Sequence, residues 1–398
     1  MRMLNVLKKT SLGFNNRIAR RRIWRWILTP LFRSVDATLV DGGQLVDKGI
    51  HRILVLRPNH RLGNVLLITP LIIELERTFP GAEIDVLAAG VSAHEVLASF
   101  SCVRHIYTLP HYIAAHLLQV VKTIVPLRKA RYDLVVDPVA NSHSNRLLLS
   151  WMKARSAIGI PSTALDDMDS HHVNWARIMP SAPAHFATLP VFMVRHALAS
   201  AHDIDETHYP SLDIRLTHSE RRDGRHIVQA LLKRQSAAPG SITIGVFADA
   251  TGAKRFDEPW WLLFLGVLAQ YHPEYAIVEI VPVDRHSRLG NRFPSYYSSS
   301  LRKLASVISN LTCFVSADGG VMHLAGASGT PTIGLFSVTD RSKYEPYGHH
   351  SQGLNVAGKN PEEVAQSVMA IVDTVMADLE KNRSPGASQR ETIASLDE

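Results

Sequence analysis

The richest chemistry in the chain follows one apolar stretch, where an aspartate, two glycines and a histidine stand close together. The apolar run Cys313–Ala317 leads into Asp318, Gly319 and Gly320, and His323 comes about one helical turn later. Glycines at the start of a helix allow backbone N–H groups to face a diphosphate. Asp318 could accept hydrogen bonds from sugar hydroxyls or cap the helix. By itself His323 would be read as a buried structural histidine, but these neighbours favour a ligand-binding role.

A second candidate loop is A-D-A-T-G-A-K-R-F, residues 248–256. It follows an apolar run, and Gly252 opens the backbone beside the hydroxyl of Thr251. Lys254 could meet a phosphate as a point charge. A surface loop with two solvated cations explains the same residues equally well when the loop is considered alone.

A third candidate loop is R-P-N-H-R-L-G-N-V, residues 57–65, and it too leaves an apolar run. Arg57, His60 and Arg61 could bind anionic groups, and Gly63 permits a tight turn or the close approach of a ligand. The alternative is an ordinary strand–helix connection with solvated cations. A lone glycine is weak evidence against that alternative.

The elements that would position these loops alternate between short apolar runs and helical stretches, which is typical of βαβ units and parallel sheets. The first half is expected to contain strands at 52–56, 83–88, 105–109, 133–137 and 156–160 and helices at 64–79, 92–100, 113–130, 144–153 and 190–202. The second half is expected to contain strands at 242–248, 277–283, 313–317 and 332–336 and helices at 260–271, 301–310, 321–328 and 361–381. Ligands of such sheets bind beyond the carboxyl ends of the strands, which is where all three loops lie.

The same pattern predicts an α/β protein with two Rossmann-like halves. We expect a basic leader at 1–50, an N-terminal domain at 51–217, a C-terminal domain at 218–355, a helix at 356–381 that crosses back, and a disordered tail at 382–398.

Composition limits the class of protein. The 398 residues are 46% hydrophobic and 20% charged, which excludes a mainly disordered chain. Two cysteines exclude a disulfide framework and favour a reducing compartment. No apolar run reaches the roughly 20 residues that a bilayer crossing needs, and we expect no signal peptide.

The positive charge is concentrated at the start of the chain. Residues 1–35 hold nine Lys or Arg and no acid, so their charge is +9. Because the whole chain has a net charge of +7, the remaining residues have a net charge of −2. Trp24 and Trp26 lie among these arginines, and tryptophan with arginine suits an anionic membrane interface. A helix packed on the body is the alternative. A nucleic-acid arm is disfavoured because the rest of the chain is slightly acidic and no nucleic-acid motif follows.

The motifs are recognisable as a set. The run D-G-G-V-M-H-L-A-G-A-S-G-T-P-T-I-G-L-F-S-V-T-D, with P-Y-G at 346–348, closely resembles the signature of the bacterial ADP-heptose:lipopolysaccharide heptosyltransferases, glycosyltransferase family 9. The opening I-L-V-L-R-P-N-H-R-L-G-N-V and the run A-T-G-A-K-R-F are similar to two further motifs of that family. The resemblance extends from about residue 51 to residue 373 and excludes the leader and tail.

The resemblance implies a GT-B fold, with two Rossmann-like domains that face each other across a cleft. The N-terminal domain would bind a lipopolysaccharide core or other lipid-linked glycan, and the C-terminal domain would bind ADP-heptose. The reaction would be inverting sugar transfer without a metal or cofactor, in the cytoplasm at the inner-membrane surface. By motif, the donor would be bound by Thr251, Lys254, Asp318, Gly319, Gly320 and His323. Lys254 and the helix N-terminus suit the charge that develops on a departing diphosphate.

One position departs from the family pattern. The residue after Gly63 is usually an aspartate, taken as the general base, but here it is Asn64. An amide cannot accept a proton at neutral pH. His60 could replace the base, because histidine titrates near neutral pH. Alternatively, Asn64 could only orient the acceptor hydroxyl, or the protein could bind its donor without turnover. We expect Arg57 and Arg61 to meet acidic groups of the acceptor.

Three rival functions stay open at the level of sequence. The chain could use another nucleotide sugar, act as a non-catalytic binding protein, or be a nucleotide-sugar epimerase of similar architecture. An epimerase would alter its nucleotide sugar without any acceptor.

Overall fold

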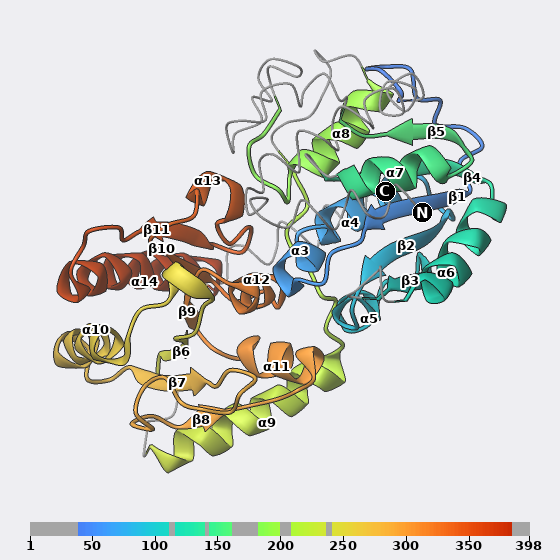
Figure 1. Ribbon diagram of the computed structural model, residues 1–398. Coiled ribbons are helices and arrows are strands. Elements are labelled where there is room, and N and C mark those ends of the chain that lie inside the picture. Colours follow the sequence, from blue (N-terminus) through green and yellow to red (C-terminus); the bar gives the residue numbers. More distant parts are fainter. Residues whose placement is uncertain are drawn as a thin grey trace, which may run out of the picture.

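The computed structural model describes residues 39–110, 116–139, 143–160, 182–199, 208–235 and 241–383, and these form two α/β halves (Figure 1). Most of the expected leader and the expected tail from residue 384 lie outside the described residues. Within those ranges, no helix combines the length and apolarity that a membrane crossing needs.

The first half is built on a parallel five-stranded sheet of order β3-β2-β1-β4-β5. Its strands are β1 (Arg52–Arg57), β2 (Glu83–Ala89), β3 (Val103–Leu109), β4 (Tyr132–Val136) and β5 (Ala154–Ile158). One face packs against α3 (Leu62–Leu66), α4 (Thr69–Thr78), α5 (Ser92–Leu97) and α8 (Leu189–Leu198). The opposite face packs against α6 (Leu117–Lys129) and α7 (His143–Trp151). Successive side chains of a strand point to opposite faces, so an almost wholly apolar strand such as β1 contributes to both cores.

The single helix expected at 64–79 is wrong, because the structure has two helices there, α3 and α4. Pro70 lies in the first turn of α4 and has no N–H with which to continue the helix from α3. The hydroxyl of Thr69 instead donates to the carbonyl oxygen of Leu66 at 2.8 Å. Proline and this hydroxyl therefore end one helix and start the next.

The second half is built on a parallel six-stranded sheet of order β11-β10-β9-β6-β7-β8. Its strands are β6 (Thr243–Phe247), β7 (Ala276–Ile280), β8 (Ser295–Tyr296), β9 (Cys313–Ala317), β10 (Thr332–Phe336) and β11 (Gln352–Asn355). One face packs against α9 (His218–Arg234), α11 (Leu301–Ile308) and α12 (Gly320–Ala327), and the other against α10 (Glu258–Tyr271) and α14 (Pro361–Arg383). The short α13 (Arg341–Tyr344) follows β10.

Sequence patterning did not find α9, β8 or β11. Helix α9 is mostly polar, but a capping box marks its start: Thr217 accepts from the backbone N–H of Glu220, whose side chain accepts from the N–H of Thr217. The strands β8 and β11 are short and poor in apolar residues, so they carry little periodic signal.

The described part of α14 packs on α10, where Val364, Val368 and Val372 are buried in the core of the second half. Its expected crossing back to the first half therefore stays an expectation.

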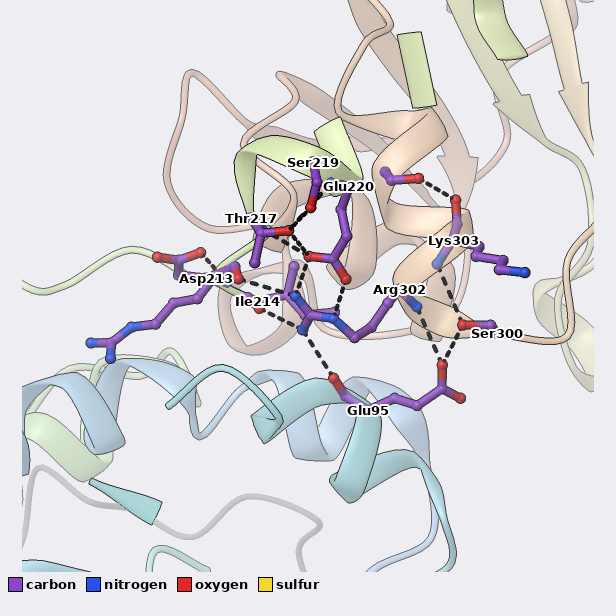
Figure 2. Close-up of polar contacts among 11 residues, drawn as sticks. Glu95, Asp213, Ile214, Thr217, Ser219, Glu220, Ser300, Arg302 and Lys303 are labelled. Atoms are coloured by element: carbon purple, nitrogen blue, oxygen red, sulfur yellow. Dashed lines mark hydrogen bonds and ion pairs between the residues drawn. The ribbon is translucent and has the colours of Figure 1, made fainter. Parts of the chain in front are cut away.

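The two halves are joined by a continuous apolar core and by polar contacts, several of which one arginine makes. Arg302, at the start of α11, donates to the carbonyl oxygens of Glu95, Ile214 and Arg215 at 3.2, 3.0 and 3.1 Å (Figure 2). Its guanidinium also pairs with Glu220 at 2.6 Å. Because Glu95 belongs to α5 of the first half, this arginine links both halves and the segment between them.

Candidate functional site

The carboxyl ends of the two sheets meet where α3 and α12 lie side by side (Figure 1). Their contact depends on glycines. A Cβ atom on Gly63 would lie 2.8 Å from Cδ2 of His323, and one on Gly320 would lie 3.0 Å from Cβ of Leu62. The first and third candidate loops, more than 250 residues apart in sequence, therefore form one site.

The second loop joins this site through an ion pair. Nζ of Lys254 lies 2.6 Å from Oδ2 of Asp318, whose side chain is 6% exposed. Lys254 ends the 3₁₀ turn η4 (Gly252–Lys254), and the exposed Thr251 immediately precedes that turn. The pair brings a cation to the start of α12.

The N-terminus of α12 has no side-chain cap. Gly319 occupies the capping position in an extended conformation that any residue can adopt, with φ of −170°. The first N–H groups of a helix have no partner within the helix, and they favour an anion. Lys254 stands beside these donors, so this end of the second sheet suits a phosphate group.

His323 is buried in the first turns of α12, and burial lowers its pKa to about 4. The nearby charge of Lys254 acts in the same direction, whereas Asp318 opposes it. The imidazole is therefore neutral at pH 7. Within the described residues, its Nδ1 is buried without a hydrogen-bond partner. A buried polar atom of this kind is costly unless a ligand or water satisfies it.

Arg57 has a positioning role that the sequence did not reveal. It is 9% exposed, and its Nε donates to the backbone oxygen of Asn64 at 2.8 Å, which holds the start of α3. Burial lowers its pKa to about 10. Arg61 is exposed at the N-cap of α3, and His60 is exposed just before it. The expected acceptor contacts of Arg57 and Arg61, and the catalytic assignment of His60, stay predictions.

Asp137 was missed in the sequence. It follows β4, next to β1, and burial raises its pKa to about 6. Its Oδ1 accepts from Nδ2 of Asn145 at 2.6 Å, and the charges of Arg57 and Arg146 partly offset the effect of burial. Its place after an apolar strand was the available signal.

Two aromatic neighbours were also missed. Burial raises the pKa of Tyr344, while the charges of Arg57 and Arg61 act in the opposite direction, so this phenol lies near the first loop. His185 contacts Glu345, with Nε2 and the carbonyl oxygen 2.8 Å apart, and it stacks on Tyr347 at 5.2 Å. The family-like P-Y-G run was the available signal for this region.

Comparisons with known proteins bear on the family and the fold of the chain. Residues 298–371 match the family model of glycosyltransferase family 9 (heptosyltransferase). No curated protein matches the chain. Among the residues that the structure describes, no three His, Cys, Asp or Glu side chains form a group that could hold a metal ion.

Solved structures share the fold. A family 9 glycosyltransferase from Veillonella parvula is 15% identical, with a TM-score of 0.63 over 83% of this chain and 98% of that one. The E. coli heptosyltransferase WaaC with ADP is 18% identical, with a TM-score of 0.58 over 81% of this chain and 99% of that one. E. coli ADP-heptose lps heptosyltransferase II is 16% identical, with a TM-score of 0.55 over 81% of this chain and 99% of that one.

These findings confirm the expected resemblance to glycosyltransferase family 9 and the expected GT-B fold with two parallel sheets. The family match over α11 to α14 includes the aspartate–glycine–histidine motif. Together they support a heptosyltransferase-like glycosyltransferase.

Proposed function

We propose that the chain is an inverting glycosyltransferase that transfers heptose from ADP-heptose to a lipopolysaccharide core or a related lipid-linked surface glycan. The observation that carries the proposal is the pairing of Lys254 with Asp318 at the uncapped N-terminus of α12. A cation and free backbone donors at the carboxyl end of a parallel sheet suit a nucleoside diphosphate. The ADP bound in the similar E. coli structure supports a donor of this class.

The proposed chemistry is stabilisation of a leaving group. As the bond between the sugar and the diphosphate breaks, negative charge grows on the diphosphate. Lys254 and the first N–H groups of α12 are fixed before the reaction, so they can stabilise that charge without reorganising. Asp318 holds the ammonium in place until the donor arrives and can accept hydrogen bonds from sugar hydroxyls. Thr251 can add a hydroxyl donor to a phosphate.

The acceptor would enter from the first half. Asn64 lies at the start of α3, where Arg57 fixes its backbone. The Asn64 amide can orient an acceptor hydroxyl but cannot remove its proton. We assign that proton transfer to His60, which lies in the same loop. General-base catalysis typically contributes about 10²–10⁴-fold to the rate, so the assignment has a measurable consequence.

The exposed Arg61 is the better candidate for an acidic group of the acceptor, because Arg57 is committed to the backbone of Asn64. Arg61→Ala should therefore raise the KM for the acceptor and leave ADP affinity unchanged. We place the reaction at the cytoplasmic surface of the inner membrane, where the basic leader would meet anionic lipid.

The decisive experiment measures turnover of ADP-heptose with a heptose-deficient lipopolysaccharide acceptor. Wild type is compared with His60→Ala and Asn64→Asp, and ADP binding by each variant is measured as the control for folding. Product from wild type that falls at least a hundredfold in His60→Ala, with ADP binding intact, would support the proposal.

The other outcomes identify the rivals. Activity only in Asn64→Asp would identify a binding protein that has lost its base, which is the reading that Asn64 favours. If ADP-heptose does not bind and another nucleotide sugar does, that other nucleotide sugar is the donor. Conversion of a nucleotide sugar without acceptor would identify an epimerase.

A further inference from the structure

The outward face of α6 carries an apolar stripe. Leu118, Val121 and Val125 are 81%, 54% and 40% exposed, and their spacing places them on one side of the helix. The opposite side is also apolar, because Ile124 and Leu127 are buried against the first sheet. The inward side attaches α6 to the sheet, and packing among the described residues does not account for the outward stripe.

The stripe continues onto α7 through one arginine. Arg128 lies one turn after Val125, and its guanidinium lies 6.0 Å from the ring centre of Trp151 and donates to the Trp151 carbonyl oxygen at 3.0 Å. Trp151 is 56% exposed. We call Leu118, Val121, Val125 and Trp151 the α6–Trp151 surface.

The two segments that carry this surface have charged side chains of one sign. Residues 116–131 and 143–155 contain no Asp or Glu. Their exposed cations are Lys122, Arg128, Lys129, Arg131, Lys153 and Arg155. An apolar stripe on helices whose charged side chains are all cations is complementary to a surface that is apolar within and anionic at its rim.

We propose that the α6–Trp151 surface docks the N-terminal domain on an anionic lipid bilayer. The aliphatic side chains would enter the boundary between headgroups and acyl chains, and the tryptophan ring would lie at headgroup depth. The cations would meet anionic headgroups, and each would tighten binding about fivefold. The residues of this surface belong to the N-terminal domain and lie outside residues 1–50 of the sequence.

The topology gives the docked surface a use. Helix α6 follows β3 and runs back along the sheet, so Leu118 lies at the same edge of the sheet as the loops that follow β1 and β4. A bilayer against α6 would therefore border the acceptor side of the candidate site. This consequence rests on the proposed function, which supplies a lipid-linked acceptor, but binding to lipid can be measured without donor or acceptor.

The test is flotation of the full chain with vesicles of phosphatidylethanolamine and phosphatidylglycerol, and with neutral phosphatidylcholine vesicles. One variant combines Leu118→Gln, Val121→Gln and Val125→Gln, and a second combines Lys122→Gln and Lys129→Gln. The matched controls are Leu263→Gln, an exposed leucine of α10, and Arg222→Gln with Arg225→Gln, two exposed cations of α9. Circular dichroism and ADP binding report whether each variant folds.

We expect wild type to bind anionic vesicles more tightly than neutral ones. The lysine variant should bind about 25-fold more weakly, from two cations at about fivefold each. The apolar variant should lose at least tenfold, and both controls should match wild type. Hydrogen exchange at residues 117–131 of wild type should slow on anionic vesicles, and exchange across α9 should not change.

Three results would overturn the inference. In the first, both variants bind anionic vesicles as tightly as wild type does, which would mean that the leader or another surface contacts the membrane. A second is unchanged exchange in α6 on vesicles. A third is failure of wild type to bind any vesicle, in which case concentration-dependent light scattering lost in the apolar variant would assign the surface to contact between copies of this chain. Each result can be read whether or not ADP-heptose is turned over.

Discussion

The glycine contact between α3 and α12 provides a sharp test of how the two halves meet. In Gly63→Ala the new Cβ would stand 2.8 Å from Cδ2 of His323 and 3.5 Å from Cα of Gly320. Carbon atoms in contact normally lie about 3.5–4.0 Å apart, so the first contact is too short by more than half an ångström. Because His323 is buried, its ring cannot move aside without disturbing its neighbours. Overpacking of this kind costs typically about 1–3 kcal/mol.

Helix propensity alone predicts the opposite result. Alanine is favoured over glycine by up to about 1 kcal/mol in a helix interior. Gly266, within α10, is the matched control, because a Cβ there would meet no heavy atom within 4 Å. We therefore expect Gly266→Ala to stabilise the protein by about 0.5–1 kcal/mol and Gly63→Ala to destabilise it by about 1–2 kcal/mol.

The assay is urea unfolding followed by circular dichroism, with ADP titration of each folded variant by calorimetry. Gly63→Ala should lower the unfolding midpoint and weaken ADP binding, since the displaced histidine belongs to the proposed donor site. If Gly63→Ala instead raises the midpoint as much as Gly266→Ala, α3 and α12 do not touch in solution. The proposed joint site would then be wrong.

Four further perturbations test other groups. Lys254→Met leaves the carboxylate of Asp318 without its cation. We expect ADP affinity to fall about 10–100-fold and the free energy of unfolding to fall by about 1–3 kcal/mol. Adding Asp318→Asn to this variant should recover the stability but not the ADP affinity. Arg302→Met removes the arginine that joins the halves, and a loss of about 3 kcal/mol in urea unfolding is expected; a loss under 1 kcal/mol would contradict its linking role. Asp137 has its pKa raised to about 6, so its contribution to stability is present below its ordinary pKa near 4 and is lost as pH rises through 6. The stability of Asp137→Asn relative to wild type should therefore rise by about 2 kcal/mol from pH 4 to 7, and a flat difference would refute the burial argument. The pH dependence that His323 contributes has the opposite sign, because its stabilisation is lost as pH falls from about 6.5 towards its lowered pKa of about 4. In acid unfolding, the difference in stability between His323→Gln and wild type should therefore change between about pH 6.5 and about pH 4.

Much of the fold could be predicted because local signals agreed with the final architecture. Strands such as Cys313–Ala317 and Thr332–Phe336 are buried on both faces, and a run of apolar residues is what such strands require. The signal failed where burial is slight. Helix α9 is largely polar, and only its capping box marked it.

The donor loop could be predicted in part because its residues are consecutive. Asp318, Gly319 and Gly320 are adjacent in sequence at the end of an apolar strand, so their local geometry follows from strand, turn and helix. The contact of Lys254 with Asp318 joins two loops 64 residues apart, and no local rule predicts that pairing. Parallel neighbouring strands β6 and β9 bring the two loops to the same edge.

By itself the sequence determined the α/β class, the resemblance to family 9 and the three loops that carry the chemistry, because these depend on residues close together in the chain. Only the tertiary structure decided that Arg57 holds the backbone of Asn64, that Gly63 faces His323 across the two halves, and that Asp137 is buried. These facts depend on burial and on contacts between distant segments. Residue type gives the chemistry that a side chain can perform, whereas packing decides its pKa, its partner and whether a substrate can reach it.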